Sequence, residues 1–413
     1  RTHKPEVSGS IPLPATIKVK VCLFMRYINK IFNSKFKILI ICLLSFIVLV
    51  SGGRAFQQAQ TISFDFHFSP AKLVSEGINH YEYILDGKHD DGPNDKIMYD
   101  QNGVYAQGLF VLFIPLTLLG WDTAKLIWSM LNIALSFLIP FLICKRFQLD
   151  KAETFIVIAL FLTSTIFRIH VSYGQQTLFT FIFLLLPFLY KSKISTILSG
   201  IGYFKFNIGY VLFLYFLSSK KFIKILLSSI PCVIGWILYC YITDTNLLKN
   251  LFQPILLLLY WDSGQAFPVT IFSLLKNINN FPPLLVLIIP LLINFLIILR
   301  IRLMKDELFK VSIICLTALG FMPHQLHDYV LLIPLLIFSI KNFNLLISKI
   351  NLLLIFYFFY FLRVISFIYG TQPWEFPYGY FGYFNSLLII LVICSNLYYY
   401  EISNKKNNSK LFW

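Results

Sequence analysis

The sequence predicts an all-α polytopic membrane protein. Of its 413 residues, 57% are hydrophobic and only 13% are charged, and the mean hydropathy is +0.73; these values exclude an ordinary soluble domain. The chain consists mostly of apolar runs long enough to cross a bilayer, which takes about 20 residues. Because the alternating pattern of a membrane barrel is absent, we expect helices to satisfy the backbone hydrogen bonds in lipid.

We expect one membrane domain between two short tails, with about 10–12 transmembrane helices. The predicted parts are a cytoplasmic tail (residues 1–35), the membrane domain (residues 36–400) with a large first outer loop (residues 54–103), and a cytoplasmic tail (residues 401–413). Residues 1–24 read as a disordered segment or an upstream extension, because Met25 and the basic residues after it resemble a natural start.

The net charge of +16 reflects membrane topology, so we expect no nucleic-acid partner. Basic residues gather in short clusters between apolar runs, as the positive-inside rule describes. Such clusters flank the whole apolar region: Lys30, Lys35 and Lys37 before the first predicted span (Ile38–Gly52), and Lys405 and Lys406 after the last. Both termini are therefore predicted to be cytoplasmic. The richness in Ile, Phe, Asn and Lys is typical of an AT-rich bacterial genome, which favours a bacterial plasma membrane.

Two apolar segments do not fit simple spans. Tyr105–Gly120 is short and contains Pro115, so we expect a helix that lies in the outer interface or enters the bilayer only partway. Ile194–Leu217 holds Lys205 near its middle and has basic clusters at both ends, which predicts a broken, re-entrant hairpin that turns near Lys205.

Acidic residues are concentrated in the predicted outer loop, which contains eight of the 19 in the chain. Asp65 lies there among aromatic residues that would seat it at the membrane interface and partly desolvate it. A carboxylate in that position suits a general base that acts on a sugar or lipid hydroxyl; the alternative is a helix cap or a solvated loop acid. All histidines except His3 also fall on the predicted outer side, with Arg168: His67, His80, His89, His170, His324 and His327.

Several other polar residues are candidates for binding a substrate. A charge such as Lys205 inside an apolar stretch is costly and usually faces a polar cavity, where a lipid phosphate would pair with it; the alternative is snorkelling to the interface. Arg168 with Gln175 suits a phosphate or sugar site, or a membrane-end anchor. His324, His327 and Asp328 have helical spacing that would allow a metal, but hydrogen bonding to phosphate or sugar suits them better.

The chain resembles the GT-C class of polyprenyl-phosphate-sugar-dependent membrane glycosyltransferases, specifically the mannosyltransferase-like family 87. The resemblance rests on the order and spacing of several short features: Asp65-Phe66, the run from Ala71 to Gly77, Tyr105-Ala106, Pro115-Leu116, Ala124 with Trp128 and Asn132, Gly174-Gln175, Gly200 to Lys205, and Pro323-His324 to His327. The chain departs from the family at Tyr105-Ala106-Gln107-Gly108, where a Tyr-x-Pro-Pro-type segment is usual, and at Phe206, where a proline often follows the lysine. These departures bear on donor specificity more than on reaction class.

The resemblance implies a GT-C-type helical bundle that moves a hexose, with mannose favoured, from a polyprenyl-phosphate donor to a glycan or glycolipid acceptor on the extracytoplasmic face. It implies inversion at the sugar, with Asp65 as general base. The residues expected to bind substrate are Lys205, Arg168, Gln175, His324, His327, Asp328, Tyr105 and His67. No cofactor is required by this chemistry, and a divalent metal is left open.

Two other classes of protein compete with this interpretation. A transporter or flippase of lipid-linked sugars explains the buried Lys205 and the broken segment equally well. It explains Asp65 and the acidic outer loop less well. A non-catalytic membrane assembly protein has no positive feature in the sequence.

Overall fold

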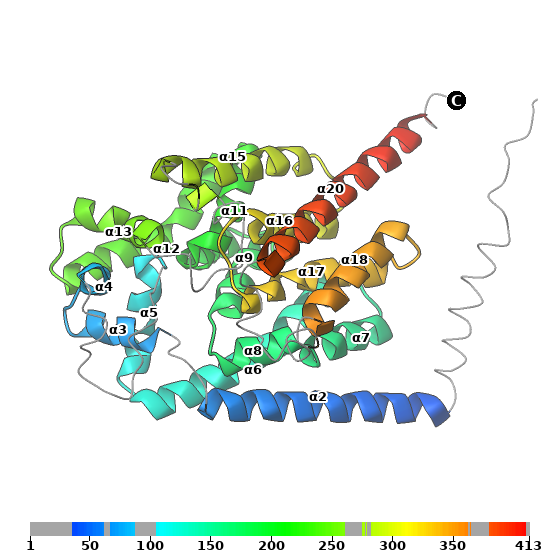
Figure 1. The fold of residues 1–413 in the computed structure, drawn as a ribbon, viewed down its shortest axis with the longest axis horizontal. Helices are drawn as coiled ribbons and strands as arrows, with labels where there is room; N and C mark the ends of the chain where they lie inside the picture. Colours follow the sequence, from blue (N-terminus) through cyan, green and yellow to red (C-terminus); the bar gives the residue numbers. More distant parts are fainter. Residues whose placement is uncertain are drawn as a thin grey trace, which may run out of the picture. The chain divides into compact units, whose positions relative to one another are not determined.

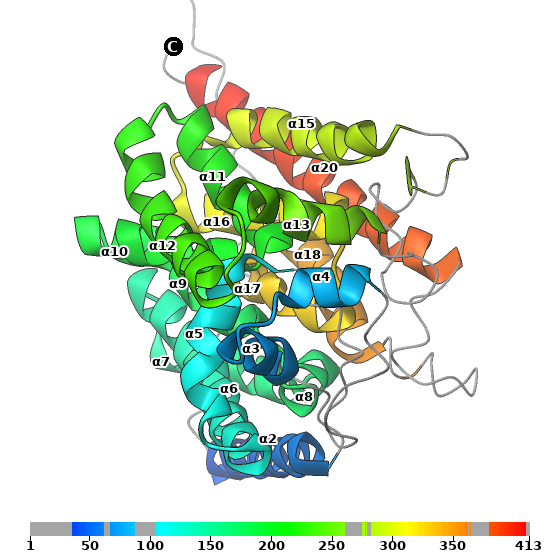
Figure 2. The ribbon, with the colours of Figure 1, turned by 90° about the vertical axis from the view of Figure 1, so that its left-hand side faces the viewer.

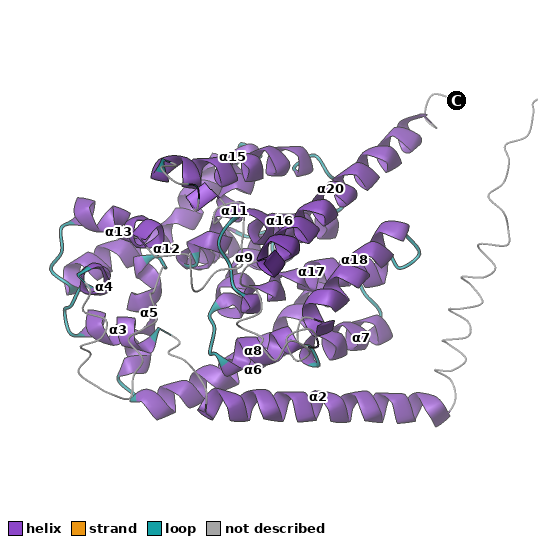
Figure 3. Ribbon diagram, in the orientation of Figure 1, coloured by secondary structure: helices purple, strands orange, loops and turns teal. Residues whose placement is uncertain are grey.

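The structure is a computed structural model that describes residues 35–61, 67–86, 105–260, 275–276, 278, 282–361, 364 and 380–409. These residues form helices and loops with no strand among them (Figure 3), which confirms the all-α prediction. The chain divides into two units, Arg1–Val50 and Ser51–Trp413, and the site described below belongs to the second. The predicted N-terminal extension, Asp65 and His89 lie outside the described residues.

Within the described ranges, five helices are long and apolar enough to span a membrane, which supports the polytopic class. They are α2 (Lys35–Thr61), α6 (Trp121–Arg146), α12 (Phe222–Ile242), α15 (Pro283–Ile301) and α20 (Tyr380–Ser409). The pair α7 (Lys151–Leu162) and α8 (Thr165–Ser172), bent by 58°, raises the number to six if it counts as one span. This number is lower than the predicted 10–12 because several apolar runs form helices of 10–17 residues.

The structure also contains shorter helices, most of which are labelled in Figure 1. The apolar ones are α5 (Gln107–Thr117), α9 (Thr177–Leu189), α11 (Phe206–Ser218), α13 (Leu247–Tyr260) and α18 (Leu346–Phe356). The others are α3 (Phe68–Ser75), α4 (His80–Leu85), α10 (Lys193–Leu198), η2 (Ser199–Phe204), α16 (Glu307–Phe321), η3 (Leu326–Leu332), α17 (Ile333–Lys341) and η4 (Tyr357–Phe361).

The helix that contains the first predicted span continues beyond the predicted end of that span. We expected it to end at Gly52 and the outer loop to begin at residue 54, but α2 continues to Thr61. Open space surrounds Gly52, so no neighbour forces the helix to stop there. Beyond it, Ala55 and Ala59 are fully buried, and the Ser51 hydroxyl donates to the carbonyl of Leu162 at 2.7 Å.

Helix α5 is short, as predicted, and packs between α3 and α12 (Figures 1 and 2). Leu109, Phe110 and Phe113 of α5 are buried against these helices. Gly235 of α12 faces Gly108 of α5, and a Cβ atom on Gly235 would come closer to the Gly108 Cα than real Cβ atoms do. The two glycines therefore permit a close helix crossing that fixes the start of α5, next to Tyr105.

The predicted break at Lys205 is confirmed. Helix η2 ends at Phe204, Lys205 adopts a non-helical backbone (φ −95°, ψ 78°), and α11 begins at Phe206. The chain then turns back on itself, because a Cβ on Gly209 would lie 2.6 Å from the carbonyl oxygen of Gly202. A residue with a side chain would not fit at that contact, so the glycine allows the tight turn that presents Lys205.

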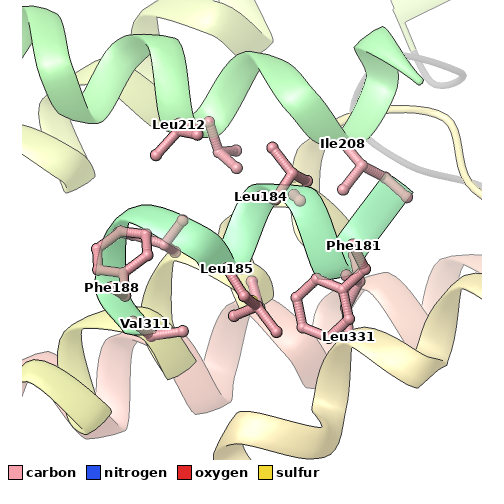
Figure 4. A pocket seen from close by; sticks show the side chains of 12 residues that line it. Phe181, Leu184, Leu185, Phe188, Ile208, Leu212, Val311 and Leu331 are labelled. Carbon is pink, nitrogen blue, oxygen red and sulfur yellow. The ribbon is translucent and has the colours of Figure 1, made fainter. Parts of the chain in front are cut away.

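Helices α9, α11 and α16 meet with η3 in an apolar core (Figure 4). Phe181, Leu184 and Leu185 of α9 face Ile208 and Leu212 of α11 around a cavity of about 20 Å³. A space this small holds at most a water molecule. The region is therefore packed core, and it separates the two ends of these three helices.

Candidate functional site

A buried ion pair lies at one end of this core. The ammonium of Lys205 donates to Oδ1 of Asp328 at 2.7 Å, and both side chains are only 2% exposed. Lys205 sits at the break between η2 and α11, and Asp328 lies in η3, which follows α16. Each charge would be costly to bury alone, so each requires the other.

Thr177, the first residue of α9, connects the two charged groups. Its hydroxyl donates to Oδ1 of Asp328 at 2.5 Å and accepts from the Lys205 ammonium at 2.7 Å. The other carboxylate oxygen of Asp328 accepts the backbone N–H of Gln325 at 3.0 Å. Burial alone would raise the pKa of the Asp328 carboxyl, but the Lys205 ammonium holds that pKa well below its usual range. The pair is therefore charged and held from three elements.

His327 adjoins this pair. Its Nε2 lies 3.5 Å from Oδ1 of Asp328, and its ring centroid lies 6.3 Å from that of His170. Burial lowers the pKa of His327 to about 3, although the Asp328 carboxylate opposes the shift. The imidazole is therefore neutral near pH 7, so it can offer one hydrogen-bond donor and one acceptor but no positive charge.

Tyr105 and His67 complete the cluster on the side of the outer loop. The Lys205 ammonium lies 5.5 Å from the centroid of the Tyr105 ring, and the His67 ring meets that ring edge-on at 4.5 Å. His67 has a φ of 64°, the left-handed region that costs a residue with a side chain roughly 1–2 kcal/mol. Such strain persists only where the surroundings impose it, and it often marks a functional position.

A second polar network links the start of α4 to α12 and α13. Figure 2 shows α3, α4, α12 and α13 in the same part of the fold. Asn79, which caps α4, donates to Gln253 of α13 at 3.0 Å and accepts from the Tyr239 hydroxyl of α12 at 2.9 Å. The neighbouring Tyr81 hydroxyl donates to the Tyr105 carbonyl at 2.5 Å. Through these bonds, α12 and α13 hold Tyr105 beside Lys205.

Several buried polar atoms around the cluster have no hydrogen-bond partner among the described residues. They are Nδ1 of His67, both amide atoms of Gln176, Nε2 of His324 and the hydroxyl of Tyr329. An unsatisfied buried polar group costs about 1–3 kcal/mol. Several such groups around one charged pair are what a site for a polar ligand requires.

The structure brings most of the predicted site residues together. Lys205, Asp328, His327, Tyr105 and His67 form one cluster, with His324 and the buried Gln175 in the adjoining turns. Nη2 of Arg168 instead donates to Thr165 of its own helix at 3.3 Å. Since His170 faces His327, Arg168 two positions earlier on α8 points to a different side.

The sequence did not single out Thr177 or Asn79. A threonine at the start of an apolar run resembles an ordinary helix residue, although the polar stretch Gln175-Gln176-Thr177 before such a run was a usable signal. Asn79 carries the capping preference of a helix N-terminus, which hides its long-range contacts. The hypothesis of a metal at His324, His327 and Asp328 gains no support, because the described part of the chain contains no group of three or more suitable ligands.

The comparisons with known proteins concern the same region. A family model described as glycosyltransferase family 87 matches residues 104–334, more than half of the chain. The match includes Tyr105, Thr177, Lys205, His327 and Asp328, whereas His67 and Asp65 precede it. No curated protein and no solved structure matches the chain.

Proposed function

Since the chain belongs to glycosyltransferase family 87 and is a membrane glycosyltransferase, we propose that it moves a hexose from a polyprenyl-phosphate donor to a glycan or glycolipid acceptor on the extracytoplasmic face. Mannose is the sugar that the family resemblance favours. The observation that carries this proposal is the Lys205–Asp328 pair, buried among unsatisfied polar atoms within the matched region. The family match also decides against the transporter as the primary interpretation.

In this proposal, Lys205 stabilises the phosphate that leaves the sugar. Its N–H groups bind Thr177 and Asp328, and the ammonium also interacts with Tyr105. A fixed cation aimed at the site where negative charge develops lowers the barrier without reorganising during the reaction. Neutral His327 adds a hydrogen-bond donor to the phosphate. His324 donates its Nδ1–H to the carbonyl of Met322 at 3.2 Å, so its Nε2 is an acceptor for a sugar hydroxyl. Because phosphate is a good leaving group, no strong general acid is required.

We propose Asp65 as the general base. It lies outside the described residues, but it precedes His67 by two positions in the chain, and two residues reach at most about 7 Å. The contact of His67 with Tyr105 supports an acceptor site beside Lys205 next to this part of the chain. The acceptor oxygen forms a bond to the anomeric carbon and gives its proton to Asp65. The bond to the phosphate oxygen breaks on the opposite face with its electron pair, so the configuration inverts.

The test is transfer of radiolabelled mannose from polyprenyl-phosphate mannose into membrane glycolipids. Wild-type protein is compared with Asp65→Asn and with Asp122→Asn at equal expression. Asp122 is the matched control, because its side chain is 91% exposed at the start of α6. We expect Asp65→Asn to reduce transfer at least a hundredfold, within the range that a general base contributes, and Asp122→Asn to leave it unchanged.

Other outcomes would change the proposal in defined ways. Full activity of Asp65→Asn would remove Asp65 from the mechanism. If other polyprenyl-phosphate hexoses are transferred and mannose is not, the sugar assignment is wrong. Movement of the lipid-linked sugar across vesicles without any transfer would favour the flippase instead.

A further inference from the structure

A large basic hollow lies at the opposite end of α9, α11 and α16 from the Lys205 cluster. Its volume is about 750 Å³, which is in the range of ligand pockets. Six lysines from separate parts of the chain line it: Lys191, Lys193, Lys220, Lys221, Lys224 and Lys310. The 13 residues of α9 separate the two ends by about 20 Å, so this basic pocket is distinct from the proposed transfer site.

The positive charge of the basic pocket is poorly compensated. Among the described residues that line it, Glu307 is the only carboxylate, and its two oxygens are shared by Arg146 at 3.0 Å and Lys191 at 3.6 Å. Burial, together with the like charges of Lys224 and Lys310, lowers the pKa of Lys221. Like charges kept close together favour an anionic ligand between them.

Two aromatic rings at the end of α11 contact three of the lysines. The ammonium of Lys221 lies 5.1 Å from the centroid of the Tyr215 ring, and that of Lys310 lies 5.9 Å from the same centroid. The ammonium of Lys224 lies 5.7 Å from the Phe216 ring. These cation–π contacts position three charges from α16 and from the start of α12 around the end of α11.

The rim of the basic pocket is apolar and exposed. Phe222 and Ile223, which line it at the start of α12, are 58% and 73% exposed. In a membrane protein, such side chains suit contact with acyl chains. Lysines next to exposed apolar side chains fit an amphipathic ligand better than a free phosphate ion.

The positive-inside rule accounts for lysines in these connections but not for their convergence. Lys191 precedes α10 and Lys193 begins it. Lys220, Lys221 and Lys224 surround the start of α12, and Lys310 is on α16. The rule requires only that the cytoplasmic connections are basic. The fold, in addition, brings these three sets of lysines together in one pocket.

We propose that the basic pocket binds the phosphate headgroup of an anionic phospholipid from the adjacent leaflet. The lysines would contact the phosphate oxygens, and Phe222 and Ile223 would contact the acyl chains. Basic pockets between membrane helices bind anionic headgroups in this way. The proposal does not depend on the identity of the sugar donor or on Asp65.

The test is a thermal unfolding titration of the full-length protein in neutral detergent with phosphatidylglycerol, phosphatidylcholine, glycerol 3-phosphate or inorganic phosphate. A ligand that binds the folded state raises Tm in proportion to its occupancy. We expect phosphatidylglycerol to raise Tm saturably and phosphatidylcholine to have little effect. Equal effects of the two lipids would overturn the proposal. If inorganic phosphate raised Tm with the same saturation as phosphatidylglycerol, the pocket would bind free phosphate and the proposal of a lipid headgroup would be wrong.

Two sets of variants locate the effect. Lys221→Gln, Lys224→Gln and Lys310→Gln combined should weaken the apparent affinity for phosphatidylglycerol at least tenfold. The matched control replaces three exposed lysines outside the basic pocket, Lys145, Lys151 and Lys349, with glutamine. Equal weakening by the control would show a general surface-charge effect and overturn the assignment to the pocket.

A further variant separates lost binding from misfolding. Lys220 follows α11 with a φ of 55°, and the N–H groups of Lys220 and Lys221 donate to the carbonyls of Leu217 and Phe216. Glycine is preferred at this position of a helix C-terminus. Lys220→Gly should therefore raise Tm without lipid and also weaken lipid binding. Unchanged lipid affinity in this folded variant would count against the basic pocket.

Discussion

The ammonium of Lys205 lies 2.7 Å from a carboxylate oxygen of Asp328, although 123 positions separate the two residues in the chain. Thr177 bridges them from a third element, so the break after η2, the turn after α16 and the start of α9 meet at one charged point. This contact organises the site, because the orientation of the ammonium depends on both partners. Four predictions follow from the site and its supports.

Removing either charge of the Lys205–Asp328 pair should destabilise the protein strongly. Lys205→Met or Asp328→Leu leaves a buried unpaired charge, and breaking such a pair costs about 3–5 kcal/mol. The double variant contains neither charge and should recover a large part of that loss, while transfer activity stays abolished in all three. Unfolding in detergent measures the coupling. Strictly additive losses would contradict a direct interaction between the two residues.

The hydroxyl of Thr177 should matter for activity. Thr177→Val keeps the shape of the side chain but removes the bridge between Lys205 and Asp328, so we expect transfer to fall at least tenfold, or about 1.4 kcal/mol in the barrier. Thr180→Val is the matched control, because the Thr180 hydroxyl donates only within α9, to the carbonyls of Gln176 and Thr177. Equal rates for the two variants would remove the bridge from the mechanism.

Stability should fall as the pH drops from about 6.5 toward 4. In the folded protein, burial lowers the pKa of His67 and His327 to about 3 and that of His324 to about 4, from the ordinary value of 6.5. In this window the unfolded chain binds protons that the folded protein does not, so the free energy of unfolding decreases with decreasing pH. Unfolding midpoints between pH 7.5 and 5 test this, and His327→Gln should reduce the slope. A flat profile would mean that these imidazoles are solvated.

The crossing of α5 and α12 should be intolerant of a single methyl group. Gly235→Ala places a Cβ against the Gly108 Cα, and overpacking of this kind costs about 1–3 kcal/mol. Because the crossing fixes the start of α5, transfer activity should also fall. Gly52→Ala, which meets no neighbour within 4 Å, should be neutral or slightly stabilising. Thermal unfolding of the two variants provides the comparison, and equal stability would show that the crossing can relax.

The break at Lys205 could be predicted from the sequence, because burying a charge in an apolar run costs free energy whichever residue pairs with it. The number of spans could not be predicted in the same way. The run in α9 is apolar enough to suggest a crossing, but the structure makes it a short helix of 13 residues. Where each helix ends depends on neighbours such as Phe204 against Gly108, which hydropathy does not contain.

The sequence by itself determined that this chain is helical and lies in a membrane, because hydropathy and backbone hydrogen bonding in lipid leave few alternatives. It also identified Lys205 as a charge whose burial needs an explanation, and His327 and Asp328 as candidates for binding phosphate or sugar. Only the tertiary structure decided that Lys205 pairs with Asp328 through Thr177. The physical reason is that a buried charge requires a partner of opposite charge, which the sequence can indicate, whereas the packing of the helices determines which distant residue is that partner.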